Sequence, residues 1–205
     1  MPGHLRLLLA SSNPGKLREY LTLAGEADFT VELLPDFGQL PPFEESAPTF
    51  AENAAGKALH YSRFADQHVL ADDSGLAVPA LGGAPGVHSA RYAGPGATDH
   101  DRVCKLLGEM AGKSGEARCA QFICVTAIAL NGRCHIITSG RAEGVLLDEP
   151  RGAQGFGYDP IFFFPGLGKT FAELTREEKN RVSHRGNSFR KALGLLLEPN
   201  SVILP

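Results

Sequence analysis

Apolar and polar positions along the chain form segments typical of strands and helices in turn. Residues 5–10, LRLLLA, are a short apolar run that ends in the polar stretch SSNPG, which predicts a buried strand followed by a tight loop. Leu17, Tyr20 and Leu21 then recur at helical spacing, so we expect a helix over residues 16–24. The chain therefore begins with a strand, a polar loop and a helix.

The next part of the chain predicts a capped helix, a short strand and a long glycine-rich segment. Thr49 and Glu52 are spaced as a capping box, and the alanine-rich stretch behind them predicts a helix to residue 65. Residues 68–71 predict a short strand that runs into the sequence DDSG. Residues 75–96 are rich in glycine and proline, which predicts a long loop, and loops of this length are usually functional or disordered.

The second half of the chain adds a hairpin and further alternating elements. Residues 117–130 and 133–141 are rich in β-forming side chains and flank Asn131-Gly132, a strong signal for a hairpin. The other expected elements are helices at 98–110, 175–181 and 186–197 and strands at 161–164 and 201–204. Helices that alternate with strands, together with one antiparallel hairpin, predict an α/β protein with a mixed sheet.

Composition is that of an ordinary globular domain. The 205 residues are 43% hydrophobic and 21% charged, and a chain of this length buries enough surface to fold without disulfides. The net charge of −3 argues against the broad basic surface that binds nucleic acid. No apolar run reaches the length of a membrane span or a signal-peptide core. The four cysteines form no CxxC pair, which is typical of reduced thiols, so we expect a cytoplasmic protein.

The loop after the first predicted strand combines groups that bind phosphate. Its residues are Ser11, Ser12, Asn13, Pro14, Gly15 and Lys16. Backbone N–H groups at a helix N-terminus, hydroxyls and a lysine together suit an anion. The alternative is a helix cap followed by a solvated lysine.

Acidic residues occur in two predicted loops. Asp72 and Asp73 follow a short strand, so their carboxylates can lie at the C-terminal edge of the sheet, where open α/β sheets bind ligands. Glu44 and Glu45 precede the capped helix. Carboxylate oxygens from separate loops suit Mg²⁺, which completes its coordination with water and substrate phosphates. The alternative for DDSG is an ordinary turn.

Positive charge gathers near the C-terminal end. Seven of the 20 lysines and arginines are Lys169, Arg176, Lys179, Arg181, Arg185, Arg190 and Lys191. The alternative is a solvated helical surface on which Glu177 pairs with Arg181. The anion loop, the carboxylates and this basic segment together favour a metal-dependent phosphohydrolase or a nucleotide-binding protein.

Two further motifs are rejected. The sequence GLGKT at 166–170 lacks the first glycine of a P-loop, because Phe163 stands at that position. His100-Asp101 lacks the further ligands of a metal phosphohydrolase, and its aspartate is explained as an acid in the first turn of a helix.

Seven motifs in one order resemble the inosine/xanthosine triphosphate pyrophosphatase family over residues 7–197. They are SSNPGK, TFAENAAGKA, ADDSGLAV, LGGAPGVHSARYAG, FGYDPIFF, AELTREEKN and SHRG. The resemblance implies an elongated mixed sheet flanked by helices, in a single domain over residues 1–205 with two lobes and a central cleft, and it implies a homodimer. It also implies Mg²⁺-dependent hydrolysis of ITP, dITP and XTP to the monophosphate and pyrophosphate, which keeps these nucleotides out of DNA and RNA. The SHR and FGYD elements favour this family over the related Maf-type pyrophosphatases.

The resemblance implies roles for single residues. Asp73 is expected to be the general base and a metal ligand, and Ser74 to touch the substrate. Glu44 is the expected second metal ligand, with Glu45 as the alternative. The other expected nucleotide contacts are Ser12, Asn13, Lys16, Phe156, Gly157, Tyr158, Asp159, Lys179, His184 and Arg185.

Base selection is expected at the 6-keto group of the purine. His184 and Arg185 can donate to a keto oxygen, whereas the amino group of ATP would face them with another donor. Phe156 or Tyr158 could stack on the base, and no residue in the sequence is identified that would reject GTP. The second hypothesis is a nucleotide-binding protein without catalysis, which would have no need of both Glu44 and Asp73 beside the phosphates.

Overall fold

The structure, a computed structural model, describes residues 5–25 and 29–197 and divides into two compact units. The first unit comprises residues 1–73, 124–140 and 185–205, and the second comprises residues 74–123 and 141–184. Each unit has a hydrophobic core of its own. The strand predicted at 201–204 lies outside the described residues.

The described strands form one mixed sheet in the order β2-β1-β3-β4-β5-β6-β7. Their bounds are β1 Leu5–Leu9, β2 Phe29–Leu33, β3 His68–Ala77, β4 Cys119–Leu130, β5 Arg133–Leu146, β6 Phe162–Phe164 and β7 Lys169–Thr170. β1 pairs in parallel with β2 and β3, whereas β6 pairs antiparallel with β5 and β7. The prediction of an α/β protein with a mixed sheet is therefore confirmed.

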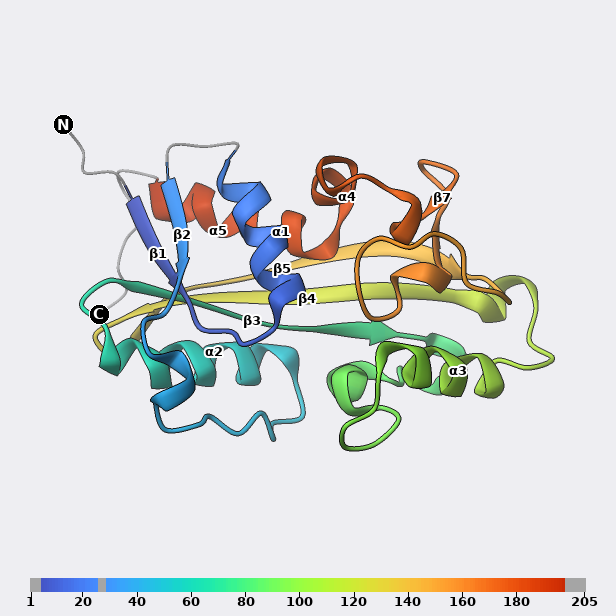
Figure 1. The fold of residues 1–205 in the computed structure, drawn as a ribbon, viewed down its shortest axis with the longest axis horizontal. Helices are drawn as coiled ribbons and strands as arrows, with labels where there is room; N and C mark the ends of the chain where they lie inside the picture. Colours follow the sequence, from blue (N-terminus) through green and yellow to red (C-terminus); the bar gives the residue numbers. More distant parts are fainter. Residues whose placement is uncertain (1–4, 26–28, 198–205) are drawn as a thin grey trace. The chain divides into compact units, whose positions relative to one another are not determined.

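In the first unit, helices cover both faces of the sheet. Helices α1 (Pro14–Ala24) and α5 (His184–Leu197) lie on one face, and α2 (Phe50–Tyr61) lies on the other (Figure 1). Successive side chains of a strand point to opposite faces. Leu7 and Leu9 of β1 accordingly pack in the core with α1 and α5, whereas Leu8 packs in the core with α2.

The second unit has an aromatic core. It contains α3 (Asp99–Glu109) and α4 (Arg176–Val182). The ring centroids of Phe122, Phe162 and Phe171 lie between 4.6 and 5.7 Å apart.

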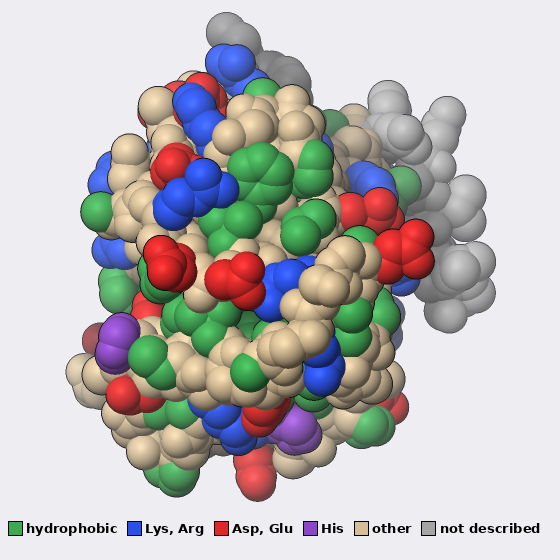
Figure 2. All heavy atoms as spheres, turned by 90° about the vertical axis from the view of Figure 1, so that its right-hand side faces the viewer, with side chains coloured by type: hydrophobic (Ala, Val, Ile, Leu, Met, Phe, Trp, Pro, Cys, Tyr) green, Lys and Arg blue, Asp and Glu red, His purple; other side chains and the backbone are tan. Residues whose placement is uncertain are grey.

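On the face of the molecule drawn in Figure 2, basic, acidic and apolar side chains are interspersed. No helix in the described part of the chain is long and apolar enough to span a membrane.

The hairpin and the helix starts follow the sequence prediction, whereas β3 is longer than predicted. Asn131 and Gly132 join β4 to β5 with φ angles of 50° and 72°, the left-handed conformation that tight hairpin turns require. β3 continues through DDSG to Ala77, so the expectation of a turn or a strand end at Asp72 is wrong. The strands β2, of five residues, and β7, of two, are not among the predicted elements.

Candidate active site

The polar loop after β1 forms the N-terminal cap of α1. The Oδ1 atom of Asn13 accepts hydrogen bonds from the backbone N–H groups of Gly15 (2.8 Å) and Lys16 (3.2 Å). The Oγ atom of Ser11 accepts the N–H of Asn13 at 3.1 Å. Pro14 is the first residue of α1. Proline has no backbone N–H, and an N–H at this position would have no partner within the helix, so no hydrogen bond is lost. The loop thus lies at the positive end of the α1 dipole, which is where a bound anion is favoured.

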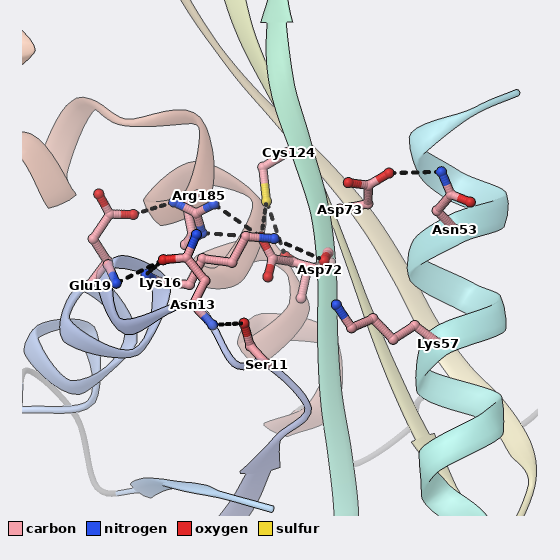
Figure 3. Close-up of polar contacts among 12 residues, drawn as sticks. Ser11, Asn13, Lys16, Glu19, Asn53, Lys57, Asp72, Asp73, Cys124 and Arg185 are labelled. Atoms are coloured by element: carbon pink, nitrogen blue, oxygen red, sulfur yellow. Dashed lines mark hydrogen bonds and ion pairs between the residues drawn. The ribbon is translucent and has the colours of Figure 1, made fainter. Parts of the chain in front are cut away.

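Lys16 joins this loop to β3 (Figure 3). Its Nζ atom lies 3.1 Å from Oδ2 of Asp72 and donates to the Asp72 carbonyl oxygen at 3.2 Å. The same Oδ2 accepts hydrogen bonds from Nε and Nη2 of Arg185 at 3.2 and 3.1 Å. Burial by itself would raise the pKa of the fully buried Asp72, but Lys16 and Arg185 outweigh it and hold that pKa well below its usual value. Asp72 therefore stays ionised at neutral pH.

Arg185 connects Asp72 with a second carboxylate. It is the largest fully buried side chain of the described residues, and its Nη1 forms an ion pair with Glu19 of α1. Burial would lower the pKa of Arg185, but Glu19 and Asp72 raise it well above its usual value. Lys16 and Arg185 thus balance two carboxylates, which is the condition for tolerating buried charge. Sequence reasoning did not select Glu19, although its place three residues after Lys16 puts both on one face of the helix.

Asp73 points to the opposite side of β3 from Asp72, toward α2 (Figure 3). Its Oδ2 accepts a hydrogen bond from Nδ2 of the buried Asn53 at 3.0 Å. Asn53 also binds both backbone groups of Ala47: its Oδ1 accepts the N–H at 3.0 Å, and its Nδ2 donates to the carbonyl at 3.3 Å. Asn53, which sequence reasoning missed, therefore ties Asp73 to the loop that carries Glu44 and Glu45.

The environment of Asp73 makes it a stronger base than a solvated aspartate. Burial raises its pKa above the usual value, Lys16 and Asn53 oppose the rise, and Glu45 and Asp72 add to it. Glu45 is half-buried, with its Oε1 atom 2.6 Å from Nζ of Lys57, whereas Glu44 is exposed. Of the two neighbouring glutamates, Glu45 is the one whose charge adds to the raised pKa of Asp73, and it is paired with Lys57.

The carboxylates suit a metal ion that is completed by its substrate. Within residues 5–25 and 29–197, no group of three or more His, Cys, Asp or Glu side chains could hold an ion. Mg²⁺ is usually bound by one or two carboxylates together with substrate phosphates. Asp73 and the neighbouring glutamates Glu44 and Glu45 are hard oxygen donors of that kind, so the residues present fit Mg²⁺ brought in with a polyphosphate.

The glycine of DDSG is required by a close approach within the second unit. A Cβ atom on Gly75 would lie 2.4 Å from the carbonyl oxygen of Gly86 and 2.3 Å from Oγ of Ser89. Ser89 bridges these segments, because its Oγ accepts the N–H of Leu76 at 2.9 Å and donates to the Gly86 carbonyl at 2.7 Å. The loop from residue 79 is therefore fixed against the strand directly after Ser74.

Residues 156–159, which we call the FGYD loop, form a hydrogen-bonded network in the second unit. Oδ2 of Asp159 accepts the N–H of Phe156 at 2.9 Å and also binds Nζ of Lys179. The same Nζ lies 5.0 Å from the centroid of the Phe156 ring. The hydroxyl of Tyr158 donates to the carbonyl of Ser89 at 3.0 Å. The side chains of Asp159, Tyr158 and Lys179 thus hold the loop in shape, a role that the sequence did not indicate.

His184 and Arg185 are both buried at the start of α5. The imidazole of His184 stacks on Phe122, with ring centroids 4.7 Å apart and an interplanar angle of 11°. Nε, Nη1 and Nη2 of Arg185 each donate to a carboxylate. The structure thus brings Lys16, Asp72 and Arg185 into one cluster, with Asp73 on the other side of the same strand.

Comparison with known proteins identifies the family. The Ham1 family model matches residues 7–195. A dITP/XTP pyrophosphatase of Geobacillus kaustophilus is 46% identical over 185 residues, covering 90% of this chain and 91% of that protein. One of Desulfotalea psychrophila is 48% identical over 182 residues, covering 89% and 81%. The structure of a HAM1 protein from Coxiella burnetii has a TM-score of 0.83 at 41% identity, covering 95% of this chain and 99% of that one. The resemblance seen in the seven motifs is confirmed, and the chain belongs to the Ham1 family.

Proposed function

We propose that this protein hydrolyses ITP, dITP and XTP to the nucleoside monophosphate and pyrophosphate, and so removes them from the nucleotide pool. The relatives described above carry the name dITP/XTP pyrophosphatase. The observation that carries the proposal is the contrast between two adjacent carboxylates. Asp72 is locked as an anion by two cations, whereas the pKa of Asp73 is raised. Asp72 is thus held in ion pairs on one side of β3, whereas Asp73, on the other side, has the raised pKa that is typical of a general base.

The triphosphate is assigned to the N-terminus of α1. Ser12 and Asn13 lie directly before the first turn of α1, at the positive end of the helix dipole, which favours a bound anion. The Asp72 contacts hold Lys16 in place, so its ammonium group needs no reordering when phosphate binds. A preorganised cation of this kind stabilises charge that develops on a leaving pyrophosphate.

Asp73 is assigned as the general base. Its raised pKa increases its affinity for the proton of an attacking water. The water forms a bond to the α-phosphorus, the bond to the bridging oxygen breaks, and pyrophosphate leaves with that oxygen. Asn53 orients the Oδ2 atom of Asp73 through its own hydrogen bond.

Mg²⁺ is the proposed cofactor. Asp73 and Glu44, with Glu45 as the alternative, would hold it together with the phosphates. When bound, the ion neutralises negative charge on the phosphate oxygens.

The purine base is assigned to the FGYD residues and to the start of α5. Phe156 is the proposed stacking ring, and the loop of Gly157, Tyr158 and Asp159 frames it. His184 is proposed to donate to the 6-keto oxygen, and Ser74 to touch the substrate next to Asp73. Arg185, whose three nitrogens already donate to Asp72 and Glu19, is proposed to hold the start of α5 in place rather than to contact the base. We propose that residues 1–205 act as one domain and that the protein is a cytoplasmic homodimer. Light scattering of the purified protein measures its oligomeric state.

Pyrophosphate release from ITP, XTP, GTP and ATP tests the function, first with Mg²⁺ and then with EDTA. Release from ITP and XTP alone, abolished by EDTA, supports both the reaction and the 6-keto recognition. Equal rates on all four nucleotides would keep the hydrolase and refute the base assignment. Tight nucleotide binding without release would identify a binding protein instead.

A further inference from the structure

The first turn of α3 is bound to the FGYD loop. Oδ2 of Asp99 accepts the backbone N–H of Gly157 at 2.7 Å, across 58 positions of sequence. We propose that Asp99 is a positioning residue: it fixes Gly157 and thereby the neighbouring Phe156 ring, and so sets the affinity and selectivity for the purine base. This inference rests on the proposed function, since that function assigns the base to the FGYD loop.

The Asp99 carboxylate is itself held in place. Arg102 lies one turn further along α3 and forms an ion pair with Oδ1 of Asp99. Nη1 of Arg102 donates to the carbonyls of Ala90 and Ala97 at 2.9 and 2.7 Å. The Arg102 guanidinium therefore binds both the glycine-rich loop and Oδ1 of Asp99. The other carboxylate oxygen of Asp99, Oδ2, accepts the N–H of Gly157.

Asp99 is not needed to cap its helix. The capping box of α3 consists of Thr98 and Asp101. Oγ1 of Thr98 accepts the N–H of Asp101 at 3.2 Å, and Oδ2 of Asp101 accepts the N–H of Thr98 at 2.8 Å. Asp99 and Asp101 are thus two acids in one helical turn with separate partners. Asp101 supports the helix, whereas Asp99 reaches a loop from a distant part of the sequence.

Buried side chains anchor the FGYD loop on both sides of Gly157. Asp159 holds the N–H of Phe156, and Tyr158 binds Ser89, both through buried side chains. Gly157 lies between these anchors with a φ angle of +63°, a conformation that a residue with a side chain rarely adopts. A charge-assisted bond to its N–H is stronger than an ordinary hydrogen bond. Loss of Asp99 should therefore loosen the middle of the loop and leave its two buried anchors in place.

Three variants of the full-length protein test the proposal: Asp99→Ala, Asp99→Asn and the matched control Asp101→Ala. Asp99→Ala should raise the KM for ITP about tenfold, which corresponds to about 1.4 kcal/mol, with kcat changed less than about twofold. The preference for ITP over ATP should fall in this variant. Asp99→Asn keeps an acceptor oxygen for Gly157 and should restore most of the affinity. Asp101→Ala should lower the melting temperature and leave the KM and the preference unchanged.

The outcomes separate the inference from the proposed function. An unchanged KM and preference in Asp99→Ala, or the same change in Asp101→Ala, would overturn the inference while hydrolysis of ITP continued. If the wild-type protein bound ITP without hydrolysing it, the proposed function would fail, and about tenfold weaker binding of ITP by Asp99→Ala would still support the positioning role. If the wild-type protein neither hydrolysed nor bound ITP, both the inference and the proposed function would be overturned.

Discussion

Neutralising Asp72 is expected to destabilise the protein, whereas neutralising its neighbour Asp73 is not. Asp72→Asn removes the charge that Lys16 and Arg185 share at 3.1 Å. Breaking a buried ion pair by removing one partner costs about 3–5 kcal/mol. Arg185 keeps its ion pair with Glu19, and the Lys16 side chain is 13% exposed, so we expect a cost near the lower end, about 3 kcal/mol.

The adjacent substitution should act in the opposite direction. The raised pKa of Asp73 means that the folded protein disfavours its ionised form. Asp73→Asn removes that charge and keeps an oxygen that can accept the hydrogen bond from Asn53. Its melting temperature should therefore equal or exceed that of the wild type, although pyrophosphate release should be lost.

Thermal unfolding followed by circular dichroism measures both effects. About 3 kcal/mol in a chain of this size lowers the melting temperature by about 6–12 °C. The pKa of Asp72 is lowered in the folded state, so its stabilisation is complete above the unfolded-state pKa of about 3.9 and is lost as the pH falls further. The deficit of Asp72→Asn should accordingly be constant from about pH 5 to 7 and shrink below about pH 4. Any gain in Asp73→Asn should be largest at neutral pH and vanish in acid.

Two results would refute this reasoning. A melting temperature of Asp72→Asn within about 2 °C of the wild type would show that the buried cluster does not depend on this charge. An equal loss of stability in both variants would show that the two carboxylates have the same environment, against the opposite pKa shifts.

Two further predictions concern a close approach of the backbone at Gly75 and the side-chain cap of α1. Gly75→Ala would force a Cβ to within 2.4 Å of the Gly86 carbonyl oxygen and should cost about 1–3 kcal/mol in thermal unfolding. The control Gly108→Ala, in α3 with nothing within 4 Å, should stabilise the protein by about 0.5–1 kcal/mol, and a loss in both would contradict the contact argument. Asn13→Ala removes the cap of α1 and should lower the stability by about 1 kcal/mol. It should also raise the KM for ITP, and an unchanged KM would argue against phosphate binding at this loop.

The sequence by itself determined the fold class and most of the secondary structure, because those signals are local. The hairpin follows from Asn131-Gly132, where two positive φ angles are needed. The starts of α2 and α3 follow from Thr49 and Thr98, whose side chains accept the N–H of the third helical residue. The polar loop 11–16 was likewise recognisable as a candidate anion site, because its cap and its lysine lie within one turn.

Only the tertiary structure decided which charges meet. Asp72 and Asp73 were predicted to lie together after the end of a short strand, and only the family resemblance singled out Asp73. In the structure β3 continues through them, so the pleat of the strand directs them to opposite faces. Arg185 binds carboxylates 113 and 166 positions away, on β3 and α1. No local pattern encodes such a distance, because it results from packing α1 and α5 on the same face of the sheet. The sequence thus supplied the residue types of the site, and the fold determined which carboxylate is locked by cations and which has a raised pKa.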